Sequence, residues 1–427
     1  MSSDSWCVLP FAHINIKPYG HFGACWRNLS DLGSYETGTL REAWNGPRFQ
    51  ELRRQLSQGE KPVGCRSCWD MEAAGTVSTR QQANKDYNKF IQALKNPLSP
   101  IQPYRWELIE IRFNNECNLM CRHCNPFNSS QLDQLGRKNR EVAELFKDHV
   151  NYKAGMVIPR LPPEIVEELC VEVLPHTKHI MMTGGEPFLQ PEHLEMLKKL
   201  QPVSSTKTLE YNSNLHVLAY KGEDFIKYWK NYEKVTLRVS IDGDRETYDY
   251  FRVNGKFERV EKNIALLKEA FGNTDERLFL QATCTTSLFQ ITRLGRIIRC
   301  FNDLGVYFHS SLTQYPRAIN IQQLPKTLRL KVQEEIHAFL ESFEHDESLW
   351  KHPFWNSSHH RGRQVKRIRL YVGRILDYIK ASTKEDDGIE EDTRKWVETL
   401  DRAHGGARFL EIYPEFTPYW GGRKDLC

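Results

Sequence analysis

Cys117, Cys121 and Cys124 stand close together in the chain, separated by three residues and then by two. Four thiolates saturate a structural zinc ion or an ordinary iron–sulfur cubane. Three close thiolates instead fill three corners of a [4Fe–4S] cluster and leave its fourth iron open to an external ligand. The spacing therefore predicts a cluster that can bind a small molecule. A zinc site completed by His123 or by a distant residue is the alternative.

A second candidate site is the sequence Gly184-Gly185-Glu186-Pro187, which follows a predicted strand. Two glycines allow the backbone to approach a ligand closely. The carboxylate of Glu186 can receive an ammonium group, and Pro187 fixes the direction in which the chain leaves the turn. Alone, such a turn is more often an ordinary strand exit. Beside the cysteine triple, it indicates a binding site.

Four further cysteines lie near the amino terminus: Cys7, Cys25, Cys65 and Cys68. Four thiols with one close pair can bind zinc or an iron–sulfur cluster. The chain has eleven cysteines in all, and an odd number without a secretory signal argues against a disulfide framework. The remaining cysteines are Cys170, Cys284 and Cys300, predicted to lie in the core, and Cys427. Cys427 is predicted to lie in a frayed tail, and a hydrogen-atom donor at the barrel mouth is the alternative.

The elements that must position these residues alternate between strands and helices from about residue 105. The predicted strands cover 107–113, 179–182, 208–212, 235–241, 278–283 and 306–310. The predicted helices between them cover 130–150, 163–173, 192–200, 223–230, 257–271 and 294–304. This alternation predicts an α/β fold with a parallel sheet or a partial (β/α)6 barrel. An antiparallel sheet with one wet face is the less favoured alternative.

Polar and apolar residues alternate along several of these strands. Thr236, Arg238, Ser240 and Asp242 form one polar row, and a second strand repeats the pattern from Gln281 onward. A closed eight-stranded barrel fills its interior with apolar side chains. The polar rows therefore predict an open barrel with a hydrated lumen that holds a ligand. On the shared face, Arg238 and Asp242 are predicted either to meet a polar substrate or to form an internal salt bridge.

The predicted domains are a small cluster-binding domain with its linking helix (1–98), the barrel (105–318) and a helical extension (319–427). Further helices are predicted over 47–58, 78–94, 326–343, 364–380 and 389–403. No apolar run is long enough for a membrane span. The 59 basic and 55 acidic residues nearly balance, which gives no sign of nucleic-acid binding. A cytoplasmic protein without a membrane or nucleic-acid partner is expected.

The cysteine triple resembles the cluster-binding loop of the radical S-adenosylmethionine (radical SAM) superfamily, over about residues 105–318. The Gly184–Pro187 sequence resembles that family's motif for the amino group of S-adenosylmethionine. The resemblance implies that a reduced [4Fe–4S] cluster, bound to S-adenosylmethionine through its open iron, cleaves it to methionine and a 5′-deoxyadenosyl radical. A low-potential electron donor such as flavodoxin or ferredoxin is then expected as a partner.

Looser matches to the same family imply further cofactor contacts by Asn214, Ser240 and Arg252. His123 departs from the family pattern, which usually has an aromatic residue just before the last cysteine, near the adenine. A histidine ring can still stack there.

The four N-terminal cysteines, with Gly20 five residues before the second of them, resemble the opening of the SPASM and twitch extensions of this superfamily. Those extensions bind auxiliary [4Fe–4S] clusters and normally follow the barrel, whereas here the cysteines precede it. Four ligands imply one auxiliary cluster. The expected function is oxidation of a peptide or protein side chain, by cross-linking, dehydrogenation or related C–H chemistry, as in the maturation of ribosomally made peptides. Alternatives are the same chemistry on a small polar metabolite and a non-catalytic, zinc-stabilised binding module.

Overall fold

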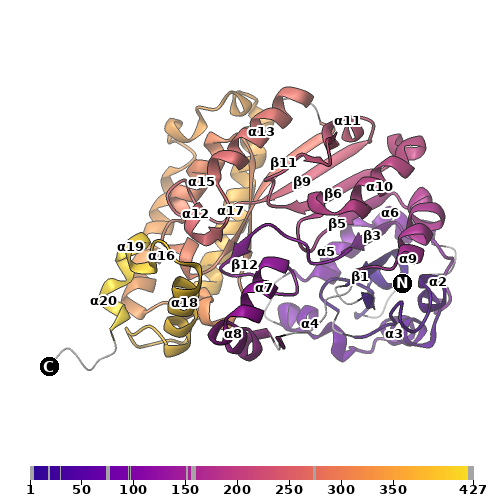
Figure 1. Cartoon of the computed structure of the whole chain (residues 1–427), viewed down its shortest axis with the longest axis horizontal. Helices are drawn as coiled ribbons and strands as arrows, with labels where there is room; N and C mark the ends of the chain where they lie inside the picture. The colour runs from indigo at the N-terminus through magenta and orange to yellow at the C-terminus, as the bar shows by residue number, and fades with distance from the viewer. Residues whose placement is uncertain are drawn as a thin grey trace. The chain divides into compact units, whose positions relative to one another are not determined.

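The structure is a computed structural model of the whole chain (Figure 1). It describes residues 4–17, 20–28, 30–73, 77–94, 96, 98–150, 152–154, 160–272 and 276–421. Cys427 lies outside them. The chain divides into two compact units. The first comprises Met1–Asn115, Ile158–Tyr211 and Tyr220–Val235, and the second comprises Glu116–Val157, Asn212–Ala219 and Thr236–Cys427.

In the eight-stranded sheet, the strands of the first unit lie in the order β2, β1, β3, β5 and β6. Their bounds are β1 (His13–Ile16), β2 (Phe22–Gly23), β3 (Leu108–Ile111), β5 (His179–Met182) and β6 (Thr208–Ser213). Parallel pairing joins β1 to β3, β3 to β5 and β5 to β6, whereas β2 is antiparallel to β1. All residues of β1 and β3 are buried, as expected for strands of a parallel sheet that is covered on both faces.

Strand β1 is not predicted from the sequence. It has only four residues, which are too few for a clear periodicity, and it stands in a stretch rich in turns and aromatic side chains. Its partner is β3, with His13 opposite Leu108 and Ile16 opposite Ile111. The pairing thus depends on a segment far along the chain, which local pattern cannot reveal.

Helices cover the first unit between these strands. They are α1 (Leu9–Ala12), α2 (Leu40–Trp44), α3 (Pro47–Ser57), α4 (Arg66–Ala73), α5 (Thr79–Asp86), α6 (Asn88–Ala93), α9 (Pro163–Glu168), α10 (Pro191–Leu200) and α11 (Phe225–Trp229). The helix predicted over 78–94 begins at a capping box, in which Ser78 accepts from the backbone of Gln81. It is interrupted at Tyr87, so that α5 and α6 replace one helix.

The strands of the second unit lie in the order β12, β11 and β9. Their bounds are β9 (Lys234–Ser240), β11 (Leu278–Thr286) and β12 (Tyr307–Leu312), and a separate small ribbon pairs β4 (Met120–Cys121) with β10 (Arg252–Val253). Burial alternates along β9: Val235, Leu237 and Val239 are buried, whereas Arg238 and Ser240 are half-buried. The predicted polar face of this strand is therefore present.

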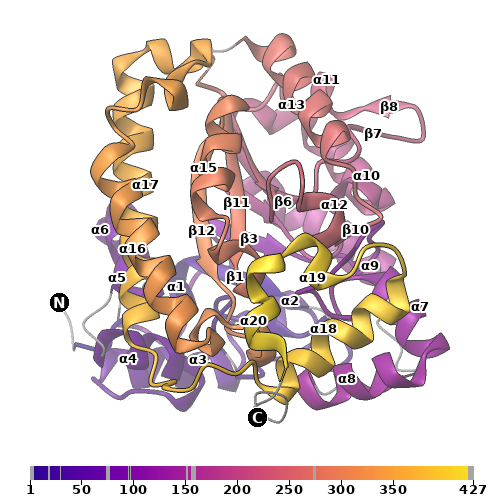
Figure 2. The ribbon, with the colours of Figure 1, turned by 90° about the vertical axis from the view of Figure 1, so that its left-hand side faces the viewer.

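The second unit carries the remaining helices. They are α7 (Ser130–Lys138), α8 (Arg140–Val150), α12 (Tyr248–Phe251), α13 (Phe257–Phe271), α14 (Leu288–Ile291), α15 (Leu294–Asp303), α16 (Lys326–Ser342), α17 (Ser358–Lys380), α18 (Glu391–His404), α19 (Phe409–Ile412) and α20 (Thr417–Trp420). Helix α17 lies along β12 and packs against α16 (Figure 2). The single helix predicted over 130–150 is wrong, because Asn139 is extended and its side chain caps α8 by accepting from Val142.

Each of the six predicted strands is present, and helices separate them, so the α/β prediction is confirmed. The described chain after β12 is helical, as predicted. No helix in the described ranges is long and apolar enough to cross a membrane. The six-stranded barrel and the domain boundaries near residues 98 and 318 stay predictions.

Candidate functional site

The loop that carries Cys117, Cys121 and Cys124 belongs to the second unit and ends at α7. Cys121 lies in β4, opposite Arg252 of β10. The backbone N–H of Cys124 donates to the carbonyl of Cys121 at 2.9 Å, which turns the chain between these two thiols. The Ser129 hydroxyl donates to the carbonyl of Leu119 at 2.6 Å and also caps α7. Local hydrogen bonds thus fix the path of the cysteine loop.

Two nitrogen donors approach the sulfur atoms of this loop. Nη1 of Arg252 lies 3.6 Å from Sγ of Cys121, and Nδ2 of Asn214 lies 4.0 Å from Sγ of Cys117. Such donors favour the thiolate over the thiol, which is the form that binds iron. Arg252 also pairs with the fully buried carboxylate of Asp242. Asp242 therefore takes part in an internal salt bridge, with Arg252 as its partner.

His123 lies within the same loop. Its ring stacks on Phe251, with centroids 5.0 Å apart and planes inclined by 7°. Burial lowers the pKa of His123 below its ordinary value, because it disfavours the imidazolium. Its Nδ1 is buried and has no hydrogen-bond partner among the residues that the structure describes. Oδ2 of Asp242 lies 4.0 Å from this atom. His123 thus presents a flat, buried ring within the cysteine loop.

Ser240 ends β9 on the half-buried face of that strand and belongs to the same unit as the cysteine loop. Arg252 and Asn214 reach the sulfur atoms of the loop directly. Both residues match the family pattern only loosely in sequence. The structure therefore connects two of the three loosely matched residues with the candidate cluster ligands.

The turn Gly184-Gly185-Glu186-Pro187 belongs to the first unit and follows β5 at its carboxyl end. Gly184 and Gly185 have φ values of +76° and +56°, which L side chains rarely adopt. A Cβ at Gly184 would lie 3.0 Å from the side chain of Arg112. The fully buried Glu186 accepts a hydrogen bond from the backbone N–H of Phe188 at 3.2 Å. Glu186 thus has a local capping role that the motif alone does not predict.

The four N-terminal cysteines also lie in the first unit, and their thiols are close to one another. Burial raises the pKa of Cys7 well above its ordinary value, and Cys25, Cys65 and Cys68 each raise it further. Burial also raises the pKa of Cys25 to about 12, with added effects of Cys65 and Cys68. Asn28 donates to Sγ of Cys65 at 3.4 Å. Four buried or half-buried thiols that destabilise one another's charged form suit a bound cation that neutralises them.

Across the described parts of the chain, no three His, Cys, Asp or Glu side chains are placed to hold a single metal ion. A tetrahedral zinc site brings all its ligands to about 2–2.3 Å from one atom. In a [4Fe–4S] cluster each thiolate binds a different iron, so the thiols lie farther apart. A zinc ion and a cluster therefore need different spacings of the same thiols.

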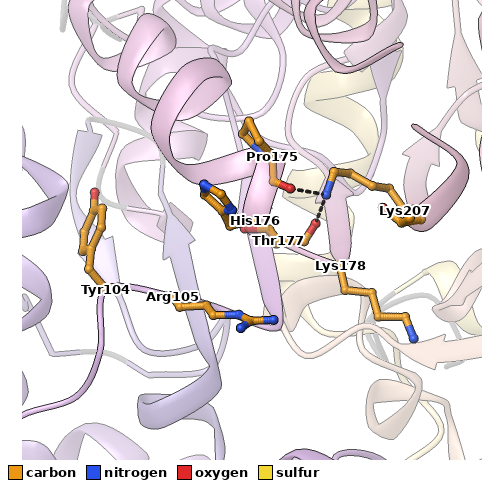
Figure 3. Close-up of a pocket in the computed structure, with 8 residues that line it drawn as sticks. Tyr104, Arg105, Pro175, His176, Thr177, Lys178 and Lys207 are labelled. Atoms are coloured by element: carbon orange, nitrogen blue, oxygen red, sulfur yellow. Dashed lines mark hydrogen bonds between the residues drawn. The ribbon is translucent and has the colours of Figure 1, made fainter. Parts of the chain in front are cut away.

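A basic pocket of about 440 Å³ also lies in the first unit (Figure 3). Arg105, His176, Lys178 and Lys207 are among the residues that line it. It lies beside the amino ends of β3, β5 and β6, whereas Gly184 follows the carboxyl end of β5. Ligands of parallel α/β sheets bind beyond the carboxyl ends of the strands. This pocket is therefore separate from the candidate site.

Sequence reasoning missed the contacts between the cysteine loop and helix α18. Arg122 is almost fully buried, and its Nη1 lies 2.7 Å from Oδ1 of Asp401 on α18. The indole of Trp396, also on α18, donates to the carbonyl of Arg122 at 3.0 Å. Helix α18 also packs against α8 (Figure 2). The C-terminal helices thus hold the backbone between two candidate cluster ligands.

Two family models match parts of the chain. Residues 111–280 match the model of the radical SAM superfamily, and residues 7–69 match the model of SPASM, an iron–sulfur cluster-binding domain. No curated protein matches the chain.

Similar solved structures include histidine-tagged anSMEcpe with bound AdoMet, at 18% identity and a TM-score of 0.38 over 55% of this chain and 60% of that chain. They include Streptococcus suis SuiB bound to S-adenosylmethionine, at 11% identity and a TM-score of 0.33 over 69% of this chain and 62% of that chain. They also include SuiB bound to the precursor peptide SuiA, at 11% identity and a TM-score of 0.34 over 70% of this chain and 60% of that chain. The chain spans about 60% of the length of anSMEcpe.

The two domains have defined cofactors. A radical SAM domain binds S-adenosylmethionine and a [4Fe–4S] cluster, and a SPASM domain binds auxiliary iron–sulfur clusters. The three thiols of the loop and the four grouped thiols near the amino terminus suit these cofactors. The chain therefore carries a radical SAM domain over residues 111–280, preceded by an iron–sulfur cluster-binding SPASM domain over residues 7–69.

Proposed function

We propose that this protein oxidises a side chain of a peptide or protein, by cross-linking, dehydrogenation or related C–H functionalisation. The observation that carries the proposal is the presence of two sets of cysteines in one chain. One is the three-cysteine loop in the radical SAM domain, and the other is the set of four mutually close cysteines in the SPASM domain. A second cluster can accept the electron that remains on a substrate radical, which favours a net oxidation. Superfamily members with such extensions mostly act on ribosomally made peptides, which favours a peptide substrate.

We assign the residue roles as follows. Cys117, Cys121 and Cys124 hold the cluster that binds S-adenosylmethionine. The cluster and its bound S-adenosylmethionine would together supply a 5′-deoxyadenosyl radical. Arg252 and Asn214 donate to two of these sulfur atoms and stabilise their thiolate form. Their positions are set by Asp242 and by Asn118, which accepts from Asn214 at 2.9 Å.

The other cofactor contacts are also proposals. The stacked His123 ring supports the adenine, and Ser240 contacts the cofactor from the end of β9. Gly184, Gly185, Glu186 and Pro187 receive the amino group of S-adenosylmethionine. Cys7, Cys25, Cys65 and Cys68 hold one auxiliary cluster. A low-potential protein such as flavodoxin or ferredoxin supplies electrons.

Anaerobic turnover tests the proposed reaction. The reconstituted protein, with S-adenosylmethionine, a strong reductant and the peptide encoded beside its gene, is expected to form 5′-deoxyadenosine and to remove two hydrogen atoms from the peptide. Mass spectrometry of the peptide and chromatography of the nucleoside measure the two products. Nucleoside formation with no mass change in any co-encoded peptide would contradict the peptide substrate and favour a small polar metabolite.

Gly184 offers a test of the cofactor turn. Gly184→Ala is expected to lower the free energy of unfolding by about 1–2 kcal/mol, because φ is +76° and an L residue is strained there. The new Cβ would also press on the side chain of Arg112 and shift the turn. We therefore expect weaker binding of S-adenosylmethionine, measured by calorimetry with the reconstituted protein.

Gly222→Ala is the matched control for this change. Gly222 has a similar φ of +81°, but a Cβ there would meet no atom within 4 Å. The Gly222→Ala variant should show a similar decrease in the free energy of unfolding and should keep its affinity for S-adenosylmethionine. Equal affinities in the two variants would show that the Gly184 turn does not contact the cofactor.

A further inference from the structure

Arginine side chains gather beside the half-buried polar face of the second unit. Arg238 extends from β9, and Gln281 lies on β11. Arg363 and Arg367 come from α17, which runs along β12 (Figure 2). We call these four residues the arginine face.

Helix α17 fixes the direction of Arg367. Strand β12 is at an end of the strand order, so one of its edges has no neighbouring strand among the described residues. The side chain of Gln364 accepts from the N–H of Phe308 at 2.9 Å, and Nε of Arg367 donates to the carbonyl of Phe308 at 2.8 Å. These bonds satisfy backbone groups of an edge strand. Nη2 of Arg367 then reaches the side-chain oxygen of Gln281.

The partners of Arg363 and Arg367 are neutral. Arg363 lies over the rings of Phe279 and Tyr307, with its Cζ 4.9 Å and 5.3 Å from their centroids. Burial lowers the pKa of Arg367, and the nearby positive charges of Arg363 and Arg238 lower it further. Within the described part of the chain, neither Arg363 nor Arg367 forms an ion pair. Arg363 and Arg367 therefore carry positive charge that no carboxylate of the described residues neutralises.

The other face of the same helix differs. Arg361 pairs with Glu347, and Arg369 pairs with Glu344. Helix α17 thus matches its outer arginines with carboxylates and leaves Arg363 and Arg367, among the described residues, without them. A guanidinium binds a carboxylate through two parallel hydrogen bonds, so an anion that enters here would gain charge-assisted bonds and relieve the repulsion.

The distance from the arginine face to the cysteine loop can be estimated along the chain. Arg238 and Asp242 are four residues apart, which corresponds to about 13 Å of extended strand. Asp242 pairs with Arg252, which contacts Sγ of Cys121. A peptide of about four extended residues covers the same distance. One end of such a peptide can bind the arginines while another residue lies near the loop.

We propose that the arginine face binds carboxylate side chains of an acidic peptide segment and so places a neighbouring residue of that peptide at the cysteine loop. This inference rests on the proposed function, because it names the substrate class of the same reaction. Asp and Glu side chains close to the modified residue are the groups that Arg363 and Arg367 recognise.

Calorimetry with an acetylated, amidated hexaglutamate peptide and the anaerobically reconstituted full chain tests the proposal. Hexaglutamate is expected to bind, and hexaglutamine at least about tenfold more weakly. Arg363→Gln and Arg367→Gln should each weaken hexaglutamate binding about tenfold, the loss expected for one charged hydrogen bond. Arg363 is exposed, so its replacement keeps the fold even if that of Arg367 loosens β12.

The controls are Arg369→Gln on the outer face of α17 and Lys178→Gln in the basic pocket of the first unit. Both should bind hexaglutamate like the unchanged protein. Equal binding of the two peptides, or no effect of Arg363→Gln, would overturn the inference. If the unchanged protein forms no 5′-deoxyadenosine from S-adenosylmethionine, the proposed function fails, whatever the peptide result.

Discussion

Replacing Cys117, Cys121 or Cys124 with alanine will abolish the formation of 5′-deoxyadenosine. Each change removes one of the three thiolates that leave a single iron open for S-adenosylmethionine. Each is also expected to lower the bound iron from about eight atoms per chain to about four, because the SPASM cluster stays in place. Anaerobic reconstitution, iron analysis and chromatography of the nucleoside measure both effects.

Two further cysteine variants complete this experiment. Cys170→Ala removes a thiol that is 3% exposed in the core and should keep both the iron and the cleavage. Cys25→Ala should lose about four irons from the SPASM site and still cleave S-adenosylmethionine. Cleavage that persists in any variant of the triple contradicts the assignment of the loop, and zinc without iron in the unchanged protein contradicts the radical chemistry.

Asp401→Ala will lower the free energy of unfolding by about 3–5 kcal/mol, the usual loss when one partner of a buried ion pair is removed. Side-chain exposure is 2% for Arg122 and 11% for Asp401, so the guanidinium would stay buried without its carboxylate. Asp401 also accepts from the hydroxyl of Tyr250 at 2.9 Å and from the backbone N–H of Phe409 at 2.8 Å. Urea denaturation followed by circular dichroism measures the change.

The same substitution should also loosen the cysteine loop, because Arg122 stands between Cys121 and Cys124. We expect faster loss of iron to a chelator at urea concentrations where the chain is still folded. Arg402→Ala on the same helix is the control: its partner is Glu141, and both side chains are more than half exposed. Arg402→Ala should lower the free energy of unfolding by less than about 1 kcal/mol. An Asp401→Ala variant as stable as this control would show that α18 does not hold the loop.

The sequence predicts those elements whose own residues specify them. Helix α13 runs over the predicted residues, 257–271, because its buried side chains recur every three or four positions and Gly272, at φ +79°, ends it. The cysteine triple is equally local, and its spacing alone indicates a cluster with one open iron. The polar face of β9 follows from strict alternation, which the structure shows.

Features that need two distant segments are not predictable in this way. Strand β1 becomes a strand because β3 lies beside it, and the partner of Arg122 lies on a helix near the other end of the chain. Asp242 illustrates the same limit, since the alternation places it on one face with Arg238 but does not identify its partner. The loop between β9 and β10 instead returns Arg252 to it, and no periodicity encodes such a return.

The pairing of β1 with β3 has a consequence for expression of the radical SAM domain alone. A shortened chain that begins after the SPASM residues would lack β1 and leave the side of β3 that faces it without a hydrogen-bonding neighbour. Its Leu108-Ile109-Glu110-Ile111 segment is rich in β-forming side chains, and an open edge of this kind recruits strands from other molecules. Self-association of the shortened chain would therefore report a missing strand rather than a natural oligomer.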